Sequence, residues 1–295
     1  MKIFVTGSTG LIGSQLCQDL VKQNHHVIEC HHGPKNFKNN SVSMDLLQIS
    51  SLNKIFSKIK PDVVVHCGAI TDVDYCENHP ETAYTVNSDS TEEIANICNE
   101  NKIFLIYLST DYVFNGSKGD YKESDPVDPI NVYGMSKLEG ENRIKSFGKN
   151  WCIIRTSTPF GIHSTKQSFP IFVINSIKNS KKIKIPIDQI TSPTFVKDLS
   201  LSICEIINKK ITGLYNISGS TQISRLEFAN LIAKNCTLNE HYIIPSYMHD
   251  LDWIARRPKN SSLNVNKINS ILDKKCNPIH NNLKSFITEL NSQKS

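Results

Sequence analysis

The residues best suited to chemistry lie between Ser109 and Lys137. Tyr133 and Lys137 are four residues apart in a segment whose pattern predicts a helix, so both side chains project from one helix face. A phenol beside an ammonium suits proton donation to a carbonyl oxygen, because a nearby cation favours the phenolate and lowers the tyrosine pKa. Thr110 follows the apolar run Ile103–Leu108, which predicts a buried strand, and its hydroxyl would hold the same oxygen. These three residues are the catalytic candidates.

A glycine motif near the N-terminus supports the functional interpretation of Tyr133 and Lys137. Without it the interpretation would be weak, because a Tyr–Lys pair at this spacing also arises by chance on solvated helix faces. The predicted strand Lys2–Thr6 is followed by Gly7, Gly10 and Gly13 and then by a helical pattern. Gly7 permits a tight turn, Gly10 lets the backbone approach a pyrophosphate, and Gly13 lets the helix pack closely on the strand. The helix N-terminus then offers its amides to the phosphates, so we expect a bound dinucleotide. The alternative is a glycine turn that only permits packing.

Further cofactor contacts are expected at the ends of the following strands. The predicted strand His26–Cys30 runs into the segment His31–Lys35, and neutral or basic residues there suit a 2′-phosphate, which favours NADPH with NADH as the alternative. Glu29 is an alternative ribose ligand, and His31 and His32 are equally well explained as polar loop residues. The predicted cofactor-binding residues are Gly7, Thr9, Gly10, Leu11, Ile12, Gly13, His31, Asp45, Leu46, Cys67, Gly68, Ala69, Thr71, Tyr133 and Lys137.

The order of elements predicts an α/β fold with a doubly wound parallel sheet of Rossmann type. Asp62–His66 and Trp151–Arg155 have the pattern of further buried strands, and Pro80–Asn101 has that of a long helix. We assign residues 1–155 to a dinucleotide-binding Rossmann domain. Residues 156–295 are predicted to form mainly a substrate-binding lobe, smaller than the first domain, partly interleaved with it and packed on the carboxyl edge of the sheet.

Polar stretches are predicted as loops. They are Gly116–Asn131, Thr158–Ser168 and Asp188–Thr194. The first of these joins the Thr110 strand to the Tyr133 helix and is expected to cover the site. Between the other two, Lys182–Ile187 alternates like an exposed strand.

Composition fits a soluble globular protein. The chain has 295 residues, of which 39% are hydrophobic and 21% charged, enough to bury a full core. The net charge of +5 is mild and no basic tract is present, so we expect no nucleic-acid partner. No apolar run reaches membrane-spanning length. The nine cysteines form no CxxC pair, so we expect no metal site, and the N-terminus leaves no room for a signal peptide. We expect reduced thiols and a cytoplasmic location.

Several segments together carry a family resemblance. They are Thr6–Gly13, Ser109–Phe114, Asn131–Lys137 and Arg155–Ser157. With them the chain resembles an extended short-chain dehydrogenase/reductase and, within that superfamily, the dTDP-4-dehydrorhamnose reductase family. Similar motifs of the substrate lobe are Asp188-Gln189, Pro193-Thr194 and Arg257-Pro258 with Ser261 and Leu263. The resemblance runs from residue 1 to about residue 265.

This resemblance implies NAD(P)H-dependent reduction of the C4 keto group of a nucleotide-linked 4-keto-6-deoxy sugar. The product would be a deoxysugar nucleotide such as dTDP-L-rhamnose. Tyr133 would be the general acid, Lys137 its pKa partner and a ribose ligand, and Thr110 would orient the carbonyl. The implied substrate-binding residues are Thr110, Asp111, Tyr133, Thr158 and Arg257. Arg257 would suit a diphosphate because its planar fork matches phosphate oxygens. A homodimer is left open.

Two departures narrow the alternatives. The family usually has Trp after its Arg-Thr-Ser, near the sugar, where this chain has Thr158, so the sugar stays undetermined. Sugar 4,6-dehydratases of the same superfamily follow the active-site Thr with Asp-Glu, whereas Thr110 is followed by Asp111 and Tyr112, which argues against a dehydratase. The remaining alternatives are a non-catalytic NADP-binding subunit similar to the regulatory subunit of methionine adenosyltransferase, and an extended reductase or epimerase for another nucleotide sugar.

Overall fold

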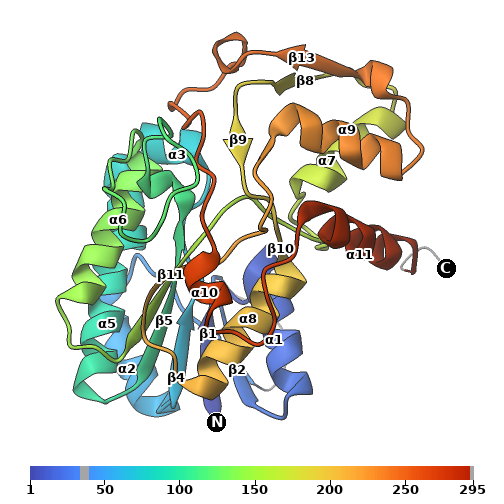
Figure 1. Cartoon of the computed structure of the whole chain (residues 1–295). Helices are drawn as coiled ribbons and strands as arrows, with labels where there is room; N and C mark the ends of the chain where they lie inside the picture. The colour runs from blue at the N-terminus through green and yellow to red at the C-terminus, as the bar shows by residue number, and fades with distance from the viewer. Residues whose placement is uncertain (34–39, 293–295) are drawn as a thin grey trace.

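A central parallel sheet organises the chain (Figure 1). The computed structural model describes residues 1–33 and 40–292, and within them this sheet has seven strands in the order β11-β6-β5-β4-β1-β2-β3. The strands are β1 (Lys2–Thr6), β2 (His26–His31), β3 (Ser41–Ser43), β4 (Val63–His66), β5 (Phe104–Thr110), β6 (Trp151–Thr156) and β11 (Gly213–Asn216). The chain winds outward in both directions from β1, and this confirms the predicted doubly wound α/β fold.

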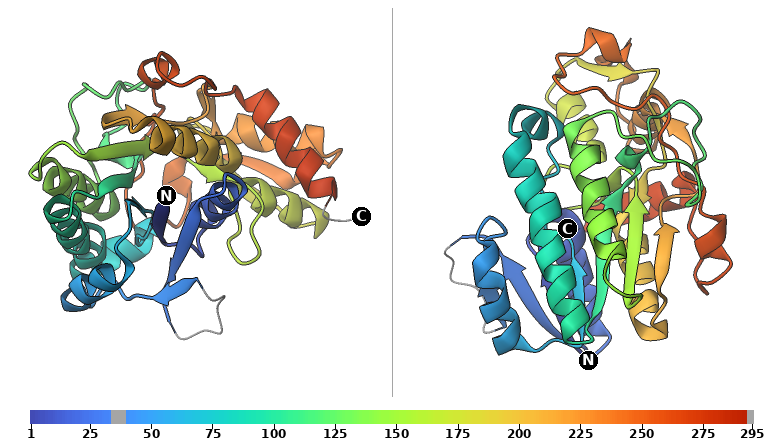
Figure 2. Two further views of the ribbon diagram at one scale, coloured as in Figure 1. Left: turned by 90° about the horizontal axis from the view of Figure 1, so that it is seen from below. Right: turned by 90° about the vertical axis from the view of Figure 1, so that its left-hand side faces the viewer.

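Helices cover both faces of the sheet because successive strand side chains point to opposite sides. Ile3 and Val5 belong to the core on one face, and Phe4 and Val64 to the core on the other. The first face is covered by α1 (Leu11–Lys22), α8 (Val196–Lys209) and the short α10 (Asn266–Asn269). The second is covered by α2 (Leu52–Ile59), α5 (Ser90–Glu100) and α6 (Val132–Lys145). Figure 2 shows α5 and α6 side by side on this face.

The predicted long helix Pro80–Asn101 is interrupted. It consists of α4 (Pro80–Tyr84), a π-helical turn over Thr85–Asp89, and α5. A shorter helix, α3 (Val73–Asn78), precedes it. A π-turn carries one extra residue per turn and is frequent at functional sites. Here it turns the side chain of Asn87 into the interior, where it is fully buried.

A lobe beyond the carboxyl ends of the strands has its own apolar core around Phe160 and Phe228 (Figure 1). Its helices are α7 (Phe169–Lys178), α9 (Arg225–Asn235) and α11 (Ile279–Ser292). Its paired short strands are β8 (Ile183–Pro186) with β13 (Ile243–Ser246), β7 (Pro159–Phe160) with β10 (Thr194–Phe195), and β9 (Ile190–Thr191) with β12 (Ile223–Ser224). Short 3-10 turns occur at Ile49–Ser51, Asp111–Val113, Glu240–Tyr242 and Met248–Asp250. Between its elements, α8 and β11 return to the central sheet.

Three local predictions in this part of the chain are wrong. The stretches 158–168 and 188–194 are not simply loops, since they contain β7, β9 and the start of β10. The strand near residues 182–187 is not an exposed one, because Ile183 and Ile185 are buried in the lobe core and only Lys184 points outward. Strands of two residues have no periodicity that a sequence could display, so their pairing is set by the tertiary fold.

A buried ion pair joins α6 to the sheet. Both oxygens of the Glu141 carboxylate accept from Arg155, at 2.8 Å from Nε and 2.7 Å from Nη2, and both residues are almost fully buried. Ser109 donates to the same carboxylate at 2.6 Å, and Lys145 at 3.1 Å. Glu141 lies on α6, Arg155 on β6 and Ser109 on β5. The pair therefore fixes the helix that carries Tyr133 against the two strands next to it.

We predict that Glu141→Gln lowers the free energy of unfolding by about 3–5 kcal/mol, because it leaves the Arg155 charge buried without a counter-charge. Urea unfolding followed by circular dichroism measures this. The matched control is Glu139→Gln on the same helix, whose side chain is 37% exposed and pairs with Arg143. Its cost should stay below about 1 kcal/mol. Equal unfolding midpoints for the two variants would contradict the assignment.

Candidate active site

The predicted catalytic residues lie where β5 ends and α6 begins. Asn131 caps α6 by accepting from the Gly134 amide at 2.8 Å, which places Tyr133 in the first turn and Lys137 one turn further on the same face. Thr110 ends β5 and hydrogen-bonds to the Tyr133 phenol. The structure thus brings Thr110 and Tyr133 into contact and buries Lys137 behind them.

The pKa values of this group differ from the sequence-based expectation. Burial raises the pKa of the Tyr133 phenol, and the hydrogen bond with Thr110 acts in the opposite direction. Burial lowers the pKa of Lys137 to about 7, with Glu141 opposing. Lys137 was expected to lower the pKa of Tyr133, but its Nζ lies 4.0 Å from the centre of the Tyr107 ring and desolvation of the phenol dominates. The phenol is consequently protonated at neutral pH, the form that can donate a proton.

Asn87 connects the end of β4 to α6. Its Oδ1 accepts from the Ile70 amide at 2.9 Å, and its Nδ2 donates to the Ile70 carbonyl and to the Ser136 hydroxyl, each at 3.0 Å. Ser136 precedes Lys137 on α6. Asn87 is therefore a fully buried residue that joins the segment after β4 to α6, and not part of an exposed helix surface.

His66 forms a second connection, which sequence reasoning did not identify. The Gly68 amide donates to the Thr6 hydroxyl at 3.0 Å, and that oxygen lies 2.6 Å from His66 Nδ1. On the other side, Nε2 lies 3.1 Å from the Thr91 hydroxyl, which donates to the Asn87 carbonyl. Since Thr91 has one proton and gives it to Asn87, His66 Nε2 carries a proton and Nδ1 accepts from Thr6. Burial lowers the pKa of His66 to about 3, so the ring is neutral.

A cavity of about 350 Å³ opens beside the glycine turn. Of the residues predicted to bind a cofactor, those that line it are Gly7, Thr9, His31, Asp45, Leu46, Gly68 and Ala69. Those that do not are Gly10, Leu11, Ile12, Gly13, Cys67, Thr71, Tyr133 and Lys137. Lining residues that the sequence did not suggest include Thr6, Met44, Ile70, Tyr75, Thr82 and Val86. Residues 10–13 do not line the cavity because the chain leaves it there and enters the first turn of α1.

The glycine turn fits a dinucleotide. A Cβ on Gly7 would lie 2.8 Å from the Gly68 amide nitrogen, and Gly7 itself has a φ of +63°, which disfavours any larger residue. A Cβ on Gly10 would approach only the Gly7 carbonyl, at 3.2 Å, so the space outside Gly10 is open. No side chain caps the first amides of α1, and its first turn holds no acidic residue. Free amides at an uncapped helix N-terminus suit phosphate oxygens.

At the far end of this cavity, His31 is buried and His32 is largely exposed. His32 Nδ1 lies 3.6 Å from a carboxylate oxygen of Asp45. Glu29, the alternative ribose ligand, is not among the described residues that line the cavity. Pro34 and Lys35, which contributed to the preference for NADPH, lie outside the described residues.

Asp111 is buried and fully engaged with the protein. Its Oδ1 accepts from Thr110 at 3.2 Å, and its Oδ2 accepts from Ser157 at 2.8 Å and from Ser261 at 2.5 Å. Burial raises the pKa of this carboxyl, and the three hydroxyls lower it. The predicted contact between Asp111 and a sugar stays a prediction. What the structure shows is a carboxylate that holds Thr110 in place.

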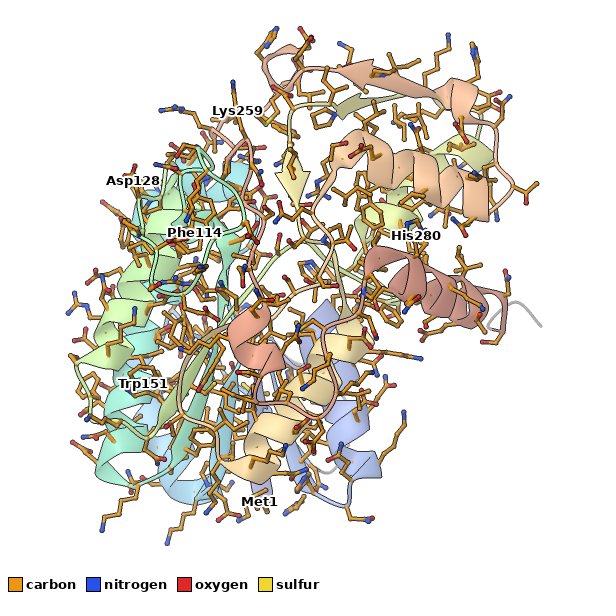
Figure 3. All side chains as sticks on the ribbon, in the orientation of Figure 1. Met1, Phe114, Asp128, Trp151, Lys259 and His280 are labelled. Atoms are coloured by element: carbon orange, nitrogen blue, oxygen red, sulfur yellow. The ribbon has the colours of Figure 1, made fainter. Side chains whose placement is uncertain are left out.

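A larger cleft of about 910 Å³ lies beside the start of α6. It is lined by parts of the predicted loop 116–131 and by residues 248–259, and Asp128 and Lys259 mark it at the end of the molecule opposite Met1 (Figure 3). Arg257 lines it, but its Nη2 lies 3.0 Å from Asp74 and its Nη1 donates to the Ala255 carbonyl at 2.9 Å. Two donors of the Arg257 guanidinium are therefore engaged with protein groups, and its predicted contact with a diphosphate stays a prediction.

The loop itself is fixed to the lobe. Tyr121 pairs with Leu263 as an isolated bridge, and its amide donates to the Ser262 carbonyl at 2.8 Å. Thr158, the other predicted substrate residue, follows β6, is half-buried and has a φ of +43°. This left-handed conformation is unfavourable for a β-branched residue, and such strain is found at functional sites.

Sequence reasoning missed side chains that surround Tyr133. The Tyr112 ring packs edge-on against the Tyr133 ring, with ring centres 5.9 Å apart. Gln189 donates from Nε2 to the Tyr112 hydroxyl at 3.2 Å. Both residues lie in segments that carried the family resemblance, so a signal for them existed. Arg225, at the start of α9, had none.

The family of this chain follows from its similarity to known proteins. The sequence model of the RmlD substrate binding domain matches residues 1–292. The chain belongs to this family. The resemblance to dTDP-4-dehydrorhamnose reductases that the sequence motifs suggested is thereby confirmed.

The relatives of this RmlD-family chain include reductases and a subunit of methionine adenosyltransferase. A probable low-salt glycan biosynthesis reductase, Agl14 of Haloferax volcanii, is 30% identical over 273 residues, 91% of each chain. The methionine adenosyltransferase 2 subunit beta of Bos taurus is 28% identical over 92% of this chain and 82% of its own. The crystal structure of dTDP-4-dehydrorhamnose reductase from Bacillus anthracis in complex with NADP has a TM-score of 0.88, 29% identity, and coverage of 98% of this chain and 99% of its own.

Among residues 1–33 and 40–292, neither a membrane-spanning helix nor a metal cluster is found. None of their helices combines the length and apolarity needed to cross a bilayer. Nor do they contain a cluster of three or more His, Cys, Asp or Glu side chains arranged to hold a metal ion.

The glycine turn yields a prediction about two neighbouring positions. In Gly13→Ala the new Cβ would overlap the Gly7 carbonyl oxygen, so the helix must shift away from the strand. We expect this to cost about 1–3 kcal/mol of unfolding free energy. Gly10→Ala meets only one atom at 3.2 Å and should stay within about 1 kcal/mol of wild type. Thermal and urea unfolding compare the two, and a Gly13→Ala variant as stable as Gly10→Ala would refute the close packing.

Proposed function

We propose that this chain is an NADPH-dependent reductase of the C4 keto group in a nucleotide-linked 4-keto-6-deoxy sugar. The product would be a deoxysugar nucleotide such as dTDP-L-rhamnose, and NADH is the alternative cofactor. The observation that carries the proposal is the contact between Thr110 and the half-buried, protonated Tyr133, with the buried Lys137 one turn further along α6. The family match and the relative crystallised with NADP support it.

The cofactor would lie in the cavity beside the glycine turn. Gly7, Thr9 and the first amides of α1 would hold its phosphates, and Gly68 and Ala69 would approach its sugars. His31 and His32 would bind the additional phosphate of NADPH by donating hydrogen bonds to its oxygens. When bound, this group supplies the hydride that adds to C4.

The remaining chemistry belongs to the side chains. Thr110 would orient the substrate oxygen through its hydroxyl, and Tyr133 would donate the phenolic proton to that oxygen as the C–O double bond becomes a single bond. Lys137, as the buried cation, would stabilise the resulting phenolate and bind a ribose hydroxyl.

A second candidate function is supported by the similarity to methionine adenosyltransferase 2 subunit beta. In that case the chain would bind NADP and regulate a catalytic partner without turnover. The presence of Thr110, Tyr133 and Lys137 together where β5 ends and α6 begins favours the reductase, since a binding protein has no need of an acid and a buried cation. An extended reductase or epimerase for another nucleotide sugar is the third candidate.

The first experiment is cofactor oxidation, followed by absorbance, with freshly generated dTDP-4-dehydro-6-deoxy-L-mannose. We expect oxidation of NADPH, faster than that of NADH. Tyr133→Phe should reduce kcat by about 10²–10⁴-fold, since general acids contribute this much, while leaving NADPH affinity unchanged. Wild-type binding of NADPH without oxidation would favour the regulatory candidate or another sugar. Full activity of Tyr133→Phe would remove it as the acid.

The lowered pKa of Lys137 predicts a pH dependence. Its ammonium is charged below its pKa of about 7 and neutral above it. We therefore expect kcat/KM for NADPH, which reports the free enzyme, to fall as the pH rises above about 7. The residual activity of Lys137→Met should lack this alkaline limb. A wild-type profile that stays level up to pH values near 10 would show that Lys137 is not the titrating group.

A further inference from the structure

The lobe brings a guanidinium to the site. Arg225 is the first residue of α9, and its backbone amide donates to the Gln189 carbonyl at 2.9 Å. Gln189 in turn donates to the Tyr112 hydroxyl at 3.2 Å, and the Tyr112 ring packs edge-on against the Tyr133 ring. The backbone of Arg225 is thus connected to the proposed acid through the side chains of Gln189 and Tyr112, and the charge of its guanidinium lowers the pKa of Tyr112.

The charge of Arg225 is not neutralised by a protein carboxylate. Its guanidinium carbon lies 4.8 Å from the centre of the Phe169 ring, and in the part of the chain that the structure describes no carboxylate lies within ion-pair distance of it. Asp111 acts on Arg225 only through longer-range attraction, since its own oxygens bind three hydroxyls. Burial lowers the pKa of Arg225, and Tyr112 and Asp111 oppose this. Arg225 is partly buried, and a charge withdrawn from water is normally paired, so an anion from outside the protein can serve as its partner.

Arg257 differs from Arg225 in that its side chain has protein partners. Its two terminal nitrogens are taken by Asp74 and by the Ala255 carbonyl, and its guanidinium carbon lies 5.2 Å from the centre of the Trp253 ring. Both Arg225 and Arg257 lower the pKa of Tyr112, so both are close to the same phenol. Arg257 therefore uses two of its five N–H donors on protein groups, whereas the described residues give the Arg225 guanidinium no side-chain hydrogen bond.

We propose that Arg225 binds an oxyanion of the substrate, which is either the diphosphate of the sugar nucleotide or, if the substrate is the other nucleotide sugar of the third candidate function, a carboxylate on the sugar. The inference rests on the proposed function, because it takes a nucleotide sugar to lie beside Tyr112 and Tyr133. A planar guanidinium can bind two oxygens of one phosphate or carboxylate at once. Its ring contact with Phe169 holds the fork in a fixed orientation, which reduces the entropy lost when the ligand binds.

Equilibrium binding separates the two sources of the oxyanion. The ligands are dTDP, thymidine, UDP-glucose and UDP-glucuronic acid, each titrated into wild type, Arg225→Met, Arg225→Lys and the control Arg143→Met. Arg143 lies on the exposed side of α6, where it pairs with Glu92 and Glu139, so its loss removes the same charge away from the site. NADPH affinity and the melting temperature show whether each variant is folded.

If the oxyanion is the diphosphate, Arg225→Met weakens binding of dTDP and both UDP-sugars by about 10- to 100-fold and leaves thymidine unchanged. If it is a carboxylate, only UDP-glucuronic acid binding weakens. Arg225→Lys, which keeps the charge without the fork, should show a smaller loss in the same ligands. If Arg225→Met bound every ligand with the same affinity as Arg143→Met, the inference about Arg225 would be wrong and the proposed function would stand. Wild type that binds NADPH but none of the nucleotide ligands would overturn the proposed function and the inference with it.

Discussion

The buried ion pair between Glu141 and Arg155 is the constraint on which the geometry of the site depends. Replacing such a pair by apolar residues often costs nothing, so it is not required for stability as such. Its effect is on position, because any sliding of α6 along β5 and β6 would leave a desolvated charge without its partner. Ser109 adds a hydrogen bond to the same carboxylate from the residue before Thr110. The helix that carries Tyr133 and the strand that carries Thr110 are therefore fixed to one point.

A chain of neutral hydrogen bonds fixes the same helix from the side of the cofactor cavity. Gly68, in the cavity wall, is connected through Thr6 and His66 to Thr91 and the carbonyl of Asn87. The Asn87 side chain continues from there to Ser136 on α6. Because His66 is buried and neutral, the chain has one arrangement of donors and acceptors near neutral pH. The wall of the cofactor cavity and the helix that carries Tyr133 are thus held in fixed positions relative to one another.

The sequence was sufficient for β1, β2, β4, β5 and β6 and for the glycine turn, because long buried strands show their pattern in the residues themselves. It did not show that β11 and α8, from the part assigned to the lobe, complete the central sheet. It could not predict that Arg225 reaches Gln189, or that Ser261 reaches Asp111, since these contacts join segments far apart in the chain. The two-residue strands of the lobe were missed for the same reason. The pKa of Tyr133 was misjudged because spacing identifies a neighbouring cation but not the loss of solvent around the phenol, which proved the larger effect.

Asp111 shows why the lobe and the sheet have to be considered together. Its carboxylate collects hydroxyls from β5, from the end of β6 and from Ser261, which lies 150 residues further along the chain. Moving the lobe by the length of one hydrogen bond would leave a buried carboxylate short of a donor, at a cost comparable with a large part of the stability of a domain. The position of Thr110 therefore depends on the lobe being in place. A division of the chain near residue 155 separates neither the elements, since α8 and β11 belong with the central sheet, nor the site.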